Sequence, residues 1–131
     1  MKNNKSICII DDDAIYVYAL KFLIDISNTY QSIIVYENGK QAFEAFEQQI
    51  LQGISLPDTV LLDINMPMWD GWRFLEALEK IYTDKNMHLY VMTSSVNSYD
   101  YNKASSFSMV KGCFEKPLKA ADIQQITESL N

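Results

Sequence analysis

Aspartates follow two of the short apolar segments in this sequence. Three of them, Asp11 to Asp13, come directly after the segment 7–10, and Asp63 comes directly after the segment 59–62. Carboxylates that meet where water is scarce repel one another, so some become protonated unless a cation lies between them. Mg²⁺ suits this role because it prefers oxygen ligands and usually takes one or two carboxylates with waters and a phosphate oxygen. The aspartates are therefore candidate ligands of a magnesium ion.

The chemistry that fits this combination is phosphoryl transfer. A carboxylate oxygen can attack phosphorus while a metal ion neutralises charge on the incoming phosphoryl group. Such a reaction passes through a loose transition state and needs positioning and electrostatic stabilisation more than acid–base catalysis. Two further residues suit it. Thr93, after the segment 88–92, offers a hydroxyl hydrogen bond, and Lys116, after the segment 111–115, offers a positive charge.

The elements that must position these residues follow from the hydrophobic pattern, in which short apolar runs alternate with longer amphipathic ones. The expected strands are 7–10, 32–36, 59–62, 88–92 and 111–115, and the expected helices are 14–26, 40–51, 72–82, 98–107 and 120–130. The first helix carries apolar residues at helical spacing, namely Ile15, Val17, Leu20, Leu23 and Ile24.

This alternation indicates a parallel sheet covered by helices on both faces. Five strand–helix units predict a doubly wound, flavodoxin-like α/β fold with a five-stranded parallel sheet in the order 2-1-3-4-5. Ligands of such folds bind outside the carboxyl ends of the strands, where the strand order reverses. We therefore expect the aspartates, Thr93 and Lys116 to share one edge of the sheet.

The aspartates also have simpler structural explanations. Aspartate is a preferred N-cap residue, and we expect Asp13 to cap the helix that begins at residue 14. This explanation is weaker for Asp11 and Asp12, because a helix needs only one cap. Asp63 taken alone could begin a turn. The combination of carboxylates, hydroxyl and lysine on one edge favours a functional site.

Length and composition predict one globular domain over residues 1–131. The chain has 17 acidic and 11 basic residues, a net charge of −6, which argues against nucleic-acid binding and suits a cation or a basic partner.

Cys8 and Cys113 show no metal-binding spacing and are expected to be buried free thiols. No apolar segment approaches the length of a signal-peptide core or a membrane span, so we expect a cytoplasmic protein that binds no membrane.

Four stretches carry a more specific signal. They are Ile7-Cys8-Ile9-Ile10-Asp11-Asp12-Asp13, Leu61-Leu62-Asp63-Ile64-Asn65-Met66-Pro67-Met68-Trp69-Asp70-Gly71, Val91-Met92-Thr93-Ser94-Ser95 and Glu115-Lys116-Pro117. The second stretch is the most specific of the four. Together they resemble the response regulator receiver domain of the CheY-like superfamily over nearly the whole chain, which implies a receiver of the stand-alone type.

The resemblance implies a role for each acidic residue. Asp63 corresponds to the aspartate that accepts the phosphoryl group. Asp12 and Asp63 would bind Mg²⁺ directly, and Asp11 would do so mainly through water. Asn65 stands where the family uses a main-chain carbonyl as a metal ligand.

The resemblance also implies a way of signalling. Thr93 corresponds to the switch hydroxyl, and Lys116 to the lysine that contacts the phosphoryl group. Family members take phosphate from a phosphohistidine on a sensor histidine kinase or a histidine phosphotransfer protein, and they catalyse only their own phosphorylation and dephosphorylation. They then repack their fourth helix, fifth strand and fifth helix to act on a downstream protein target.

Two positions depart from the family. An aromatic switch residue usually stands three positions before the lysine, where this chain has Cys113. Phe114 follows, but alternation along a strand would point it to the opposite face. Trp69 stands where many relatives have methionine, and we expect it to be a partly exposed loop aromatic.

Two alternative functions stay open. One is a non-phosphorylated pseudo-receiver that acts as an interaction module, which Cys113 leaves open. The other is a Mg²⁺-dependent phosphohydrolase with an aspartyl nucleophile. That class usually places its nucleophile on the first strand, within Asp-x-Asp followed by Thr or Val, whereas here the aspartates are followed by Ala14.

Overall fold

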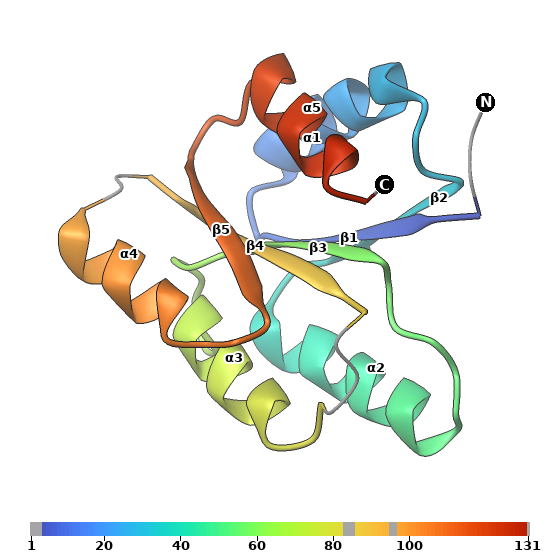
Figure 1. Ribbon diagram of the computed structural model, residues 1–131. Helices are drawn as coiled ribbons and strands as arrows, with labels where there is room; N and C mark the ends of the chain where they lie inside the picture. The colour runs from blue at the N-terminus through green and yellow to red at the C-terminus, as the bar shows by residue number, and fades with distance from the viewer. Residues whose placement is uncertain (1–3, 83–85, 95–96, 131) are drawn as a thin grey trace.

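Strands and helices alternate along the chain in the computed structural model, which describes residues 4–82, 86–94 and 97–130 (Figure 1). The strands are β1 (Ser6–Ile10), β2 (Ser32–Tyr36), β3 (Thr59–Asp63), β4 (His88–Thr93) and β5 (Val110–Glu115). The helices are α1 (Ala14–Ser27), α2 (Gly39–Leu51), α3 (Gly71–Glu79), α4 (Ser98–Ser105) and α5 (Ala120–Glu128). Every predicted element is present. The strands match their predicted bounds to within one residue, whereas the last three helices end two or three residues early because the chain turns there.

The strands form one parallel sheet in the order β2-β1-β3-β4-β5, which confirms the predicted fold. Helices α1 and α5 cover one face of this sheet, and α2, α3 and α4 cover the other (Figure 1). The order reverses between β1 and β3, so the loops that follow these two strands meet at the carboxyl edge of the sheet.

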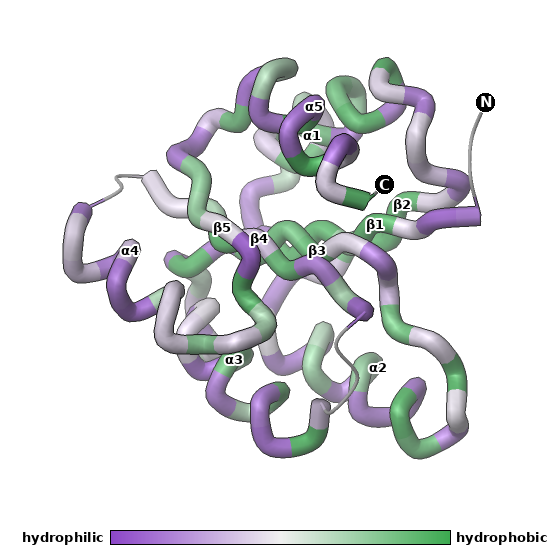
Figure 2. Tube along the Cα trace, viewed as in Figure 1, coloured by the Kyte–Doolittle hydropathy of each residue, from purple (hydrophilic) through white to green (hydrophobic). Residues whose placement is uncertain are grey.

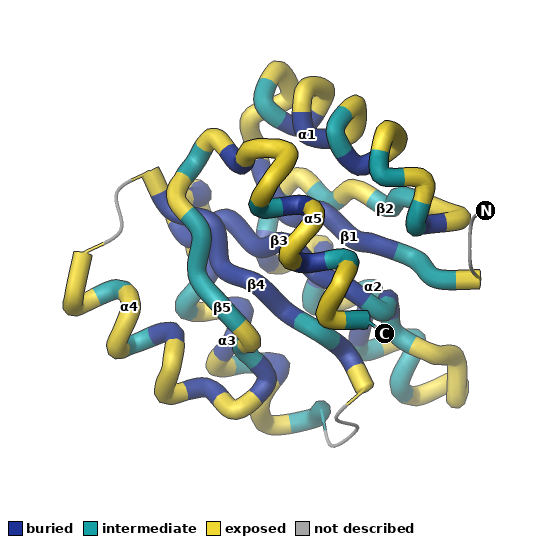
Figure 3. Tube along the Cα trace, turned by 45° about the horizontal axis from the view of Figure 1, so that its top comes forward, coloured by how far each residue is buried: buried dark blue, intermediate teal, exposed yellow. Residues whose placement is uncertain are grey.

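The core consists of two apolar layers, one on each face of the sheet. Successive strand residues point to opposite faces, so Cys8 and Ile10 pack toward α2 and α3, while Ile7 and Ile9 pack toward α1 and α5. The central strands are the most apolar part of the trace in Figure 2 and the most buried part in Figure 3. This double burial explains why these strands read as continuous apolar runs.

Helix α1 differs from the sequence prediction at its first turn. Val17, Leu20 and Ile24 are buried and Leu23 is half-buried, as expected, but the side chain of Ile15 is 85% exposed. Residues advance by about 100° around a helix, so Ile15 lies about 200° from Val17 and cannot share its buried face. Ile15 is therefore a surface residue.

The two cysteines are free thiols, as expected, and Cys8 is buried. Cys113 is only half-buried, contrary to expectation, because β5 is an edge strand of the sheet. Within the described residues, no helix has both the length and the apolar character that crossing a bilayer requires.

Candidate functional site

The carboxyl ends of β1 and β3 bring three aspartates together. Asp63 is the last residue of β3, and Asp11 and Asp12 directly follow the neighbouring strand β1. One carboxylate oxygen from each of the three lies within 4.8 Å of the others. Asp11 and Asp63 are 2% and 3% exposed, whereas Asp12 is exposed. The cluster is therefore buried toward the sheet and open to solvent at Asp12.

Lys116 adds a positive charge to this cluster. It follows β5, and its Nζ lies 2.9 Å from Asp11 Oδ2 and 3.6 Å from Asp63 Oδ2. Burial lowers the pKa of Lys116, but the hydrogen bond with Asp11 and the charges of Asp11 and Asp63 outweigh burial and raise the pKa overall. The lysine is thus held in its charged form between two carboxylates.

The surroundings of Asp63 disfavour its negative charge. Burial raises the pKa of Asp63 to about 6, and the charge of Asp11 adds to this effect. Lys116 and the backbone N–H of Asn65, which donates to Asp63 Oδ1 at 3.2 Å, oppose it. The carboxylate therefore gains from any further cation placed beside it.

This donor set fits a hard divalent cation. The three aspartates offer only oxygen ligands, and the open side at Asp12 gives access to the waters that Mg²⁺ retains. A cation would also relieve the repulsion from Asp11 that helps to raise the pKa of Asp63. Asn65 lies in the loop after β3 and is exposed.

The predicted hydroxyl lies at the same edge. Thr93 ends β4 and is 2% exposed, and its carbonyl accepts the backbone N–H of Lys116 at 2.8 Å. Met92 pairs with Asp63 in the parallel register, so Thr93 stands one residue beyond the position opposite Asp63. Ser94 is exposed, and Ser95 lies outside the described residues. The predicted site residues at this edge are Asp11, Asp12, Asp63, Asn65, Thr93 and Lys116.

Local hydrogen bonds hold the aspartates after β1. Asp13 caps α1, as predicted, because its Oδ1 accepts the backbone N–H groups of Ile15 and Tyr16, each at 3.1 Å. The backbone N–H of Asp13 in turn donates to Asp11 Oδ1 at 2.9 Å. Hydrogen bonds from nearby backbone N–H groups thus hold the carboxylates of Asp11 and Asp13, whereas Asp12 between them faces solvent.

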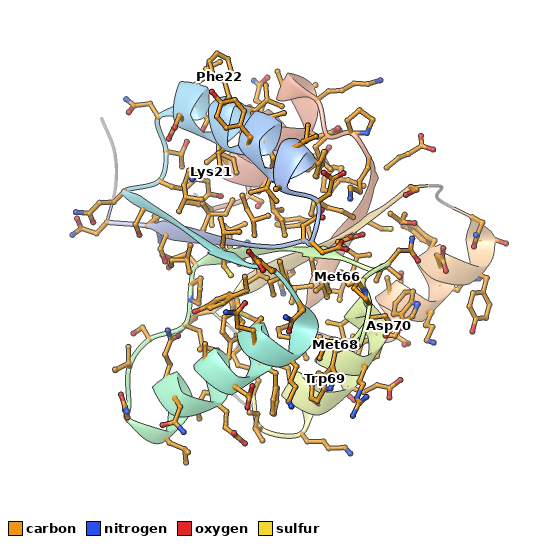
Figure 4. All side chains as sticks on the ribbon, turned by 180° about the vertical axis from the view of Figure 1, so that it is seen from behind. Lys21, Phe22, Met66, Met68, Trp69 and Asp70 are labelled. Carbon is orange, nitrogen blue, oxygen red and sulfur yellow. The ribbon has the colours of Figure 1, made fainter. Side chains whose placement is uncertain are left out.

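The loop between β3 and α3 packs beside the start of α2 (Figure 4). The half-buried ring of Trp69 lies 5.5 Å from the Phe43 ring, and the Arg73 guanidinium lies 4.4 Å from the Trp69 centroid.

A Cβ at Gly71, the first residue of α3, would lie 2.7 Å from the carbonyl oxygen of Asp63. Glycine therefore lets α3 begin against the backbone of Asp63, and the Asp-Gly pair is the sequence signal for this approach.

One residue that the sequence did not single out also touches the site. Tyr16 lies in the first turn of α1, and Lys116 Nζ is 4.4 Å from the centroid of its ring. Its only signal in the sequence is its place in the helix that follows the aspartates.

Comparison with known proteins agrees with this geometry. A family model described as the response regulator receiver domain matches residues 7–128. A solved structure of a two component response regulator from Cytophaga hutchinsonii superimposes with a TM-score of 0.89 at 24% identity, covering 98% of this chain and 97% of that one. That similarity concerns the fold.

Two curated proteins are similar over part of their length. The probable methanogenesis regulatory protein FilR2 of Methanothrix harundinacea is 29% identical over 93 residues, which are 71% of this chain and 59% of the relative. The sensor histidine kinase CheAY of Helicobacter pylori is 35% identical over 63 residues, which are 48% of this chain and 7% of the relative. The chain thus spans less than two thirds of either relative.

Proposed function

Because the chain belongs to the response regulator receiver family, we propose that Asp63 accepts a phosphoryl group from a phosphohistidine of a partner protein. The observation that carries this proposal is the meeting of Asp63 with Asp11, Asp12 and Lys116 at one edge of the sheet. An acceptor carboxylate needs a cation for the phosphoryl oxygens and oxygen ligands for a metal, and this edge offers both.

In the proposed reaction, one carboxylate oxygen of Asp63 attacks the phosphorus of the phosphohistidine. An O–P bond forms and the N–P bond breaks, while the imidazole nitrogen keeps the electron pair and takes a proton from water. Attack of water on the resulting acyl phosphate later releases phosphate and restores the carboxylate. The protein thus catalyses only its own phosphorylation and dephosphorylation.

The other residues position and neutralise the phosphoryl group. Lys116 turns from Asp11 toward a phosphoryl oxygen, and the Thr93 hydroxyl donates to another. Asp12, Asp63 and the carbonyl of Asn65 would hold Mg²⁺ directly, and Asp11 would hold it through water. An ion held there would neutralise charge on the phosphoryl oxygens.

The phosphohydrolase alternative is less well supported. It would use an aspartate that follows the first strand as its nucleophile. Asp11, the buried aspartate at that place, accepts the Asp13 N–H at one oxygen and the Lys116 ammonium at the other. Its oxygens are therefore engaged, whereas Asp63 Oδ2 lies 3.6 Å from the lysine.

We further propose that the phosphohistidine partner, a sensor histidine kinase or a histidine phosphotransfer protein, docks on α1 in the cytoplasm. Four apolar side chains at helical spacing are exposed on this helix: Ile15 at 85%, Tyr18 at 80%, Phe22 at 63% and Ile26 at 64%. Figure 4 shows Phe22 pointing away from the sheet. Exposed apolar patches mark interaction sites, and this one begins three residues after Asp12, close enough for a docked partner to reach the acceptor.

The acceptor is tested by incubating the protein with Mg²⁺ and acetyl phosphate and measuring its intact mass. The wild-type protein should gain one phosphoryl group, and Asp63→Asn should gain none. Asp70→Asn is the matched control, because Asp70 caps α3 through a hydrogen bond from the Arg73 N–H and asparagine caps equally well. Undiminished single-site labelling of Asp63→Asn would refute the assignment.

The docking face is tested with two phosphodonors. Phe22→Ser should slow transfer from a phosphorylated histidine phosphotransfer protein, yet leave labelling by acetyl phosphate unchanged, because the small donor needs no helix surface. Equal slowing with both donors would contradict docking on α1.

A further inference from the structure

Tyr16 makes three contacts, two of them with the segment that carries Lys116 and one with β4. The Lys116 ammonium lies over the face of its ring, 4.4 Å from the centroid. The backbone N–H of Leu118 donates to its hydroxyl at 3.2 Å, and the hydroxyl donates to Met92 Sδ at 3.6 Å. Tyr16 thus joins α1 to β4 and to the loop between β5 and α5.

The hydroxyl keeps the proton that it donates to Met92 Sδ. Burial raises the pKa of Tyr16, although the hydrogen bond from Leu118 and the charge of Lys116 lower it. Met92 immediately precedes Thr93 and pairs with Asp63 across the sheet, so the hydroxyl is anchored beside two site residues.

The ring and the carboxylate of Asp11 hold Lys116 in different ways. Asp11 Oδ2 lies 2.9 Å from Nζ and takes up one of its N–H donors. An aromatic face attracts an ammonium through its quadrupole, so it leaves the N–H donors free for other oxygens. Were Asp11 to help hold a metal ion and a phosphoryl group to form on Asp63, the contact of Lys116 with Asp11 would weaken, whereas its contact with the ring could persist.

We propose that Tyr16 is the positioning residue for Lys116. The ring of Tyr16 keeps the Lys116 ammonium at the phosphoryl site when Asp11 no longer does. This inference rests on the proposed phosphorylation of Asp63. Tyr16 touches no reacting atom and acts on the lysine through the face of its ring.

The inference is tested by titrating beryllofluoride, a mimic of the phosphoryl group, into the Mg²⁺-loaded protein and following the bound species by ¹⁹F NMR. Tyr16→Leu should weaken binding by about threefold to tenfold, as expected for loss of a partly buried cation–π contact. Tyr16→Phe keeps the ring and should stay within about twofold of the wild-type protein. Mg²⁺ affinity without beryllofluoride should be unchanged in both variants, because Tyr16 contributes no metal ligand.

A double-mutant cycle separates positioning from general support of the fold. Tyr16→Leu should have no further effect on beryllofluoride binding in a Lys116→Met background, because the residue then has nothing to position. Tyr30→Leu is the matched control. This variant removes a tyrosine from the same apolar layer. The Tyr30 hydroxyl bonds to Thr59, at the end of β3 away from Asp63, so Tyr30→Leu should lower thermal stability without changing beryllofluoride affinity.

Each other outcome has a distinct meaning. Wild-type protein that binds no beryllofluoride and takes no phosphoryl group would refute the proposed function. Two results would overturn the role of Tyr16 and leave the proposed function standing. One is a Tyr16→Leu protein that binds beryllofluoride with wild-type affinity. The other is a Tyr16→Leu substitution that weakens beryllofluoride binding by the same factor in the Lys116→Met background as in the wild-type background. If Tyr16→Leu does not fold, Tyr16→Met fills a similar volume without an aromatic face, and the same expectations and refutations apply to it.

Discussion

At Asp63, folding changes the affinity of a single carboxylate for protons. Burial, followed by the charge of Asp11, raises its pKa from 3.8 to about 6, so between these pH values the folded chain holds a proton that the unfolded chain has lost. The favourable contribution of Asp63 to stability is therefore fully present below pH 3.8 and is lost as the pH rises through about 6. At neutral pH the charged Asp63 destabilises the metal-free fold.

Replacing Asp63 by asparagine should therefore stabilise the metal-free protein at pH 7, by about 1–3 kcal/mol. This gain in the free energy of unfolding should shrink toward zero near pH 4, where Asp63 is protonated in the folded state. Urea unfolding in the presence of a chelator at both pH values measures the difference. Asp70→Asn should show no such pH dependence, and an equal gain for Asp63→Asn at both pH values would contradict the argument.

Cys113 stands where the family usually places an aromatic switch residue. Its half-buried thiol packs against the apolar layer under α4, while the ring of Phe114 packs on the opposite face, 5.7 Å from Tyr90. Under the proposed function Thr93 would turn toward a phosphoryl group, and a small thiol would gain little by moving with it. Position 113 is therefore expected to contribute little to switching.

This expectation separates two variants. We expect beryllofluoride to change the hydrogen-exchange rate of α4. Cys113→Ala should show the same change as the wild-type protein. Thr93→Ala should not show it, even at beryllofluoride concentrations at which the variant is bound. Hydrogen exchange followed by mass spectrometry reports both. A Cys113→Ala protein that binds beryllofluoride normally without any response in α4 would show that the thiol does take part.

At the scale of elements, the join between β3 and α3 depends on the absence of a side chain at Gly71. A Cβ there would lie 2.7 Å from the carbonyl oxygen of Asp63 and 2.8 Å from the Cα of Ile64. Both are backbone atoms, so either α3 or the end of β3 must move. Asp63 would move with β3.

Gly71→Ala should therefore lower the free energy of unfolding by about 1–3 kcal/mol and also slow labelling by acetyl phosphate. Gly53→Ala is a useful comparison, because Gly53 has a φ of +70° and a Cβ added there would meet no other part of the described chain within 4 Å. That variant should lose stability through backbone strain while its labelling rate stays normal. Chemical unfolding and intact-mass time courses test both, and normal labelling of a destabilised Gly71→Ala protein would argue against coupling to Asp63.

For the molecule as a whole, a metal ion held by the acidic cluster would link metal binding to folding. A ligand that binds only the folded state stabilises it, by about 2.7 kcal/mol at a concentration one hundred times its Kd. Asp12→Ala should remove most of this Mg²⁺-dependent rise in melting temperature. In chelator the variant should melt no lower than the wild-type protein, because an exposed carboxylate that repels its neighbours is gone. A lower melting temperature in chelator would indicate a structural role for Asp12 instead.

The sequence by itself determined the succession of strands and helices, the strand order and the edge at which the candidate site residues gather. It could do so because burial on both faces makes a central strand continuously apolar, so the polar residue that ends the apolar run of β1 or β3 marks the sheet edge. The cap formed by Asp13 was also predictable, since it involves only neighbouring residues.

Only the tertiary structure decided which side chains meet across the molecule. Lys116 and Asp11 are 105 positions apart, and their 2.9 Å contact depends on how α1 and the loop after β5 pack on the sheet. The same packing places the Tyr16 ring over the ammonium. Periodicity sets the faces of each element, but the distances between elements follow from the fit of whole side-chain layers, which no local pattern encodes.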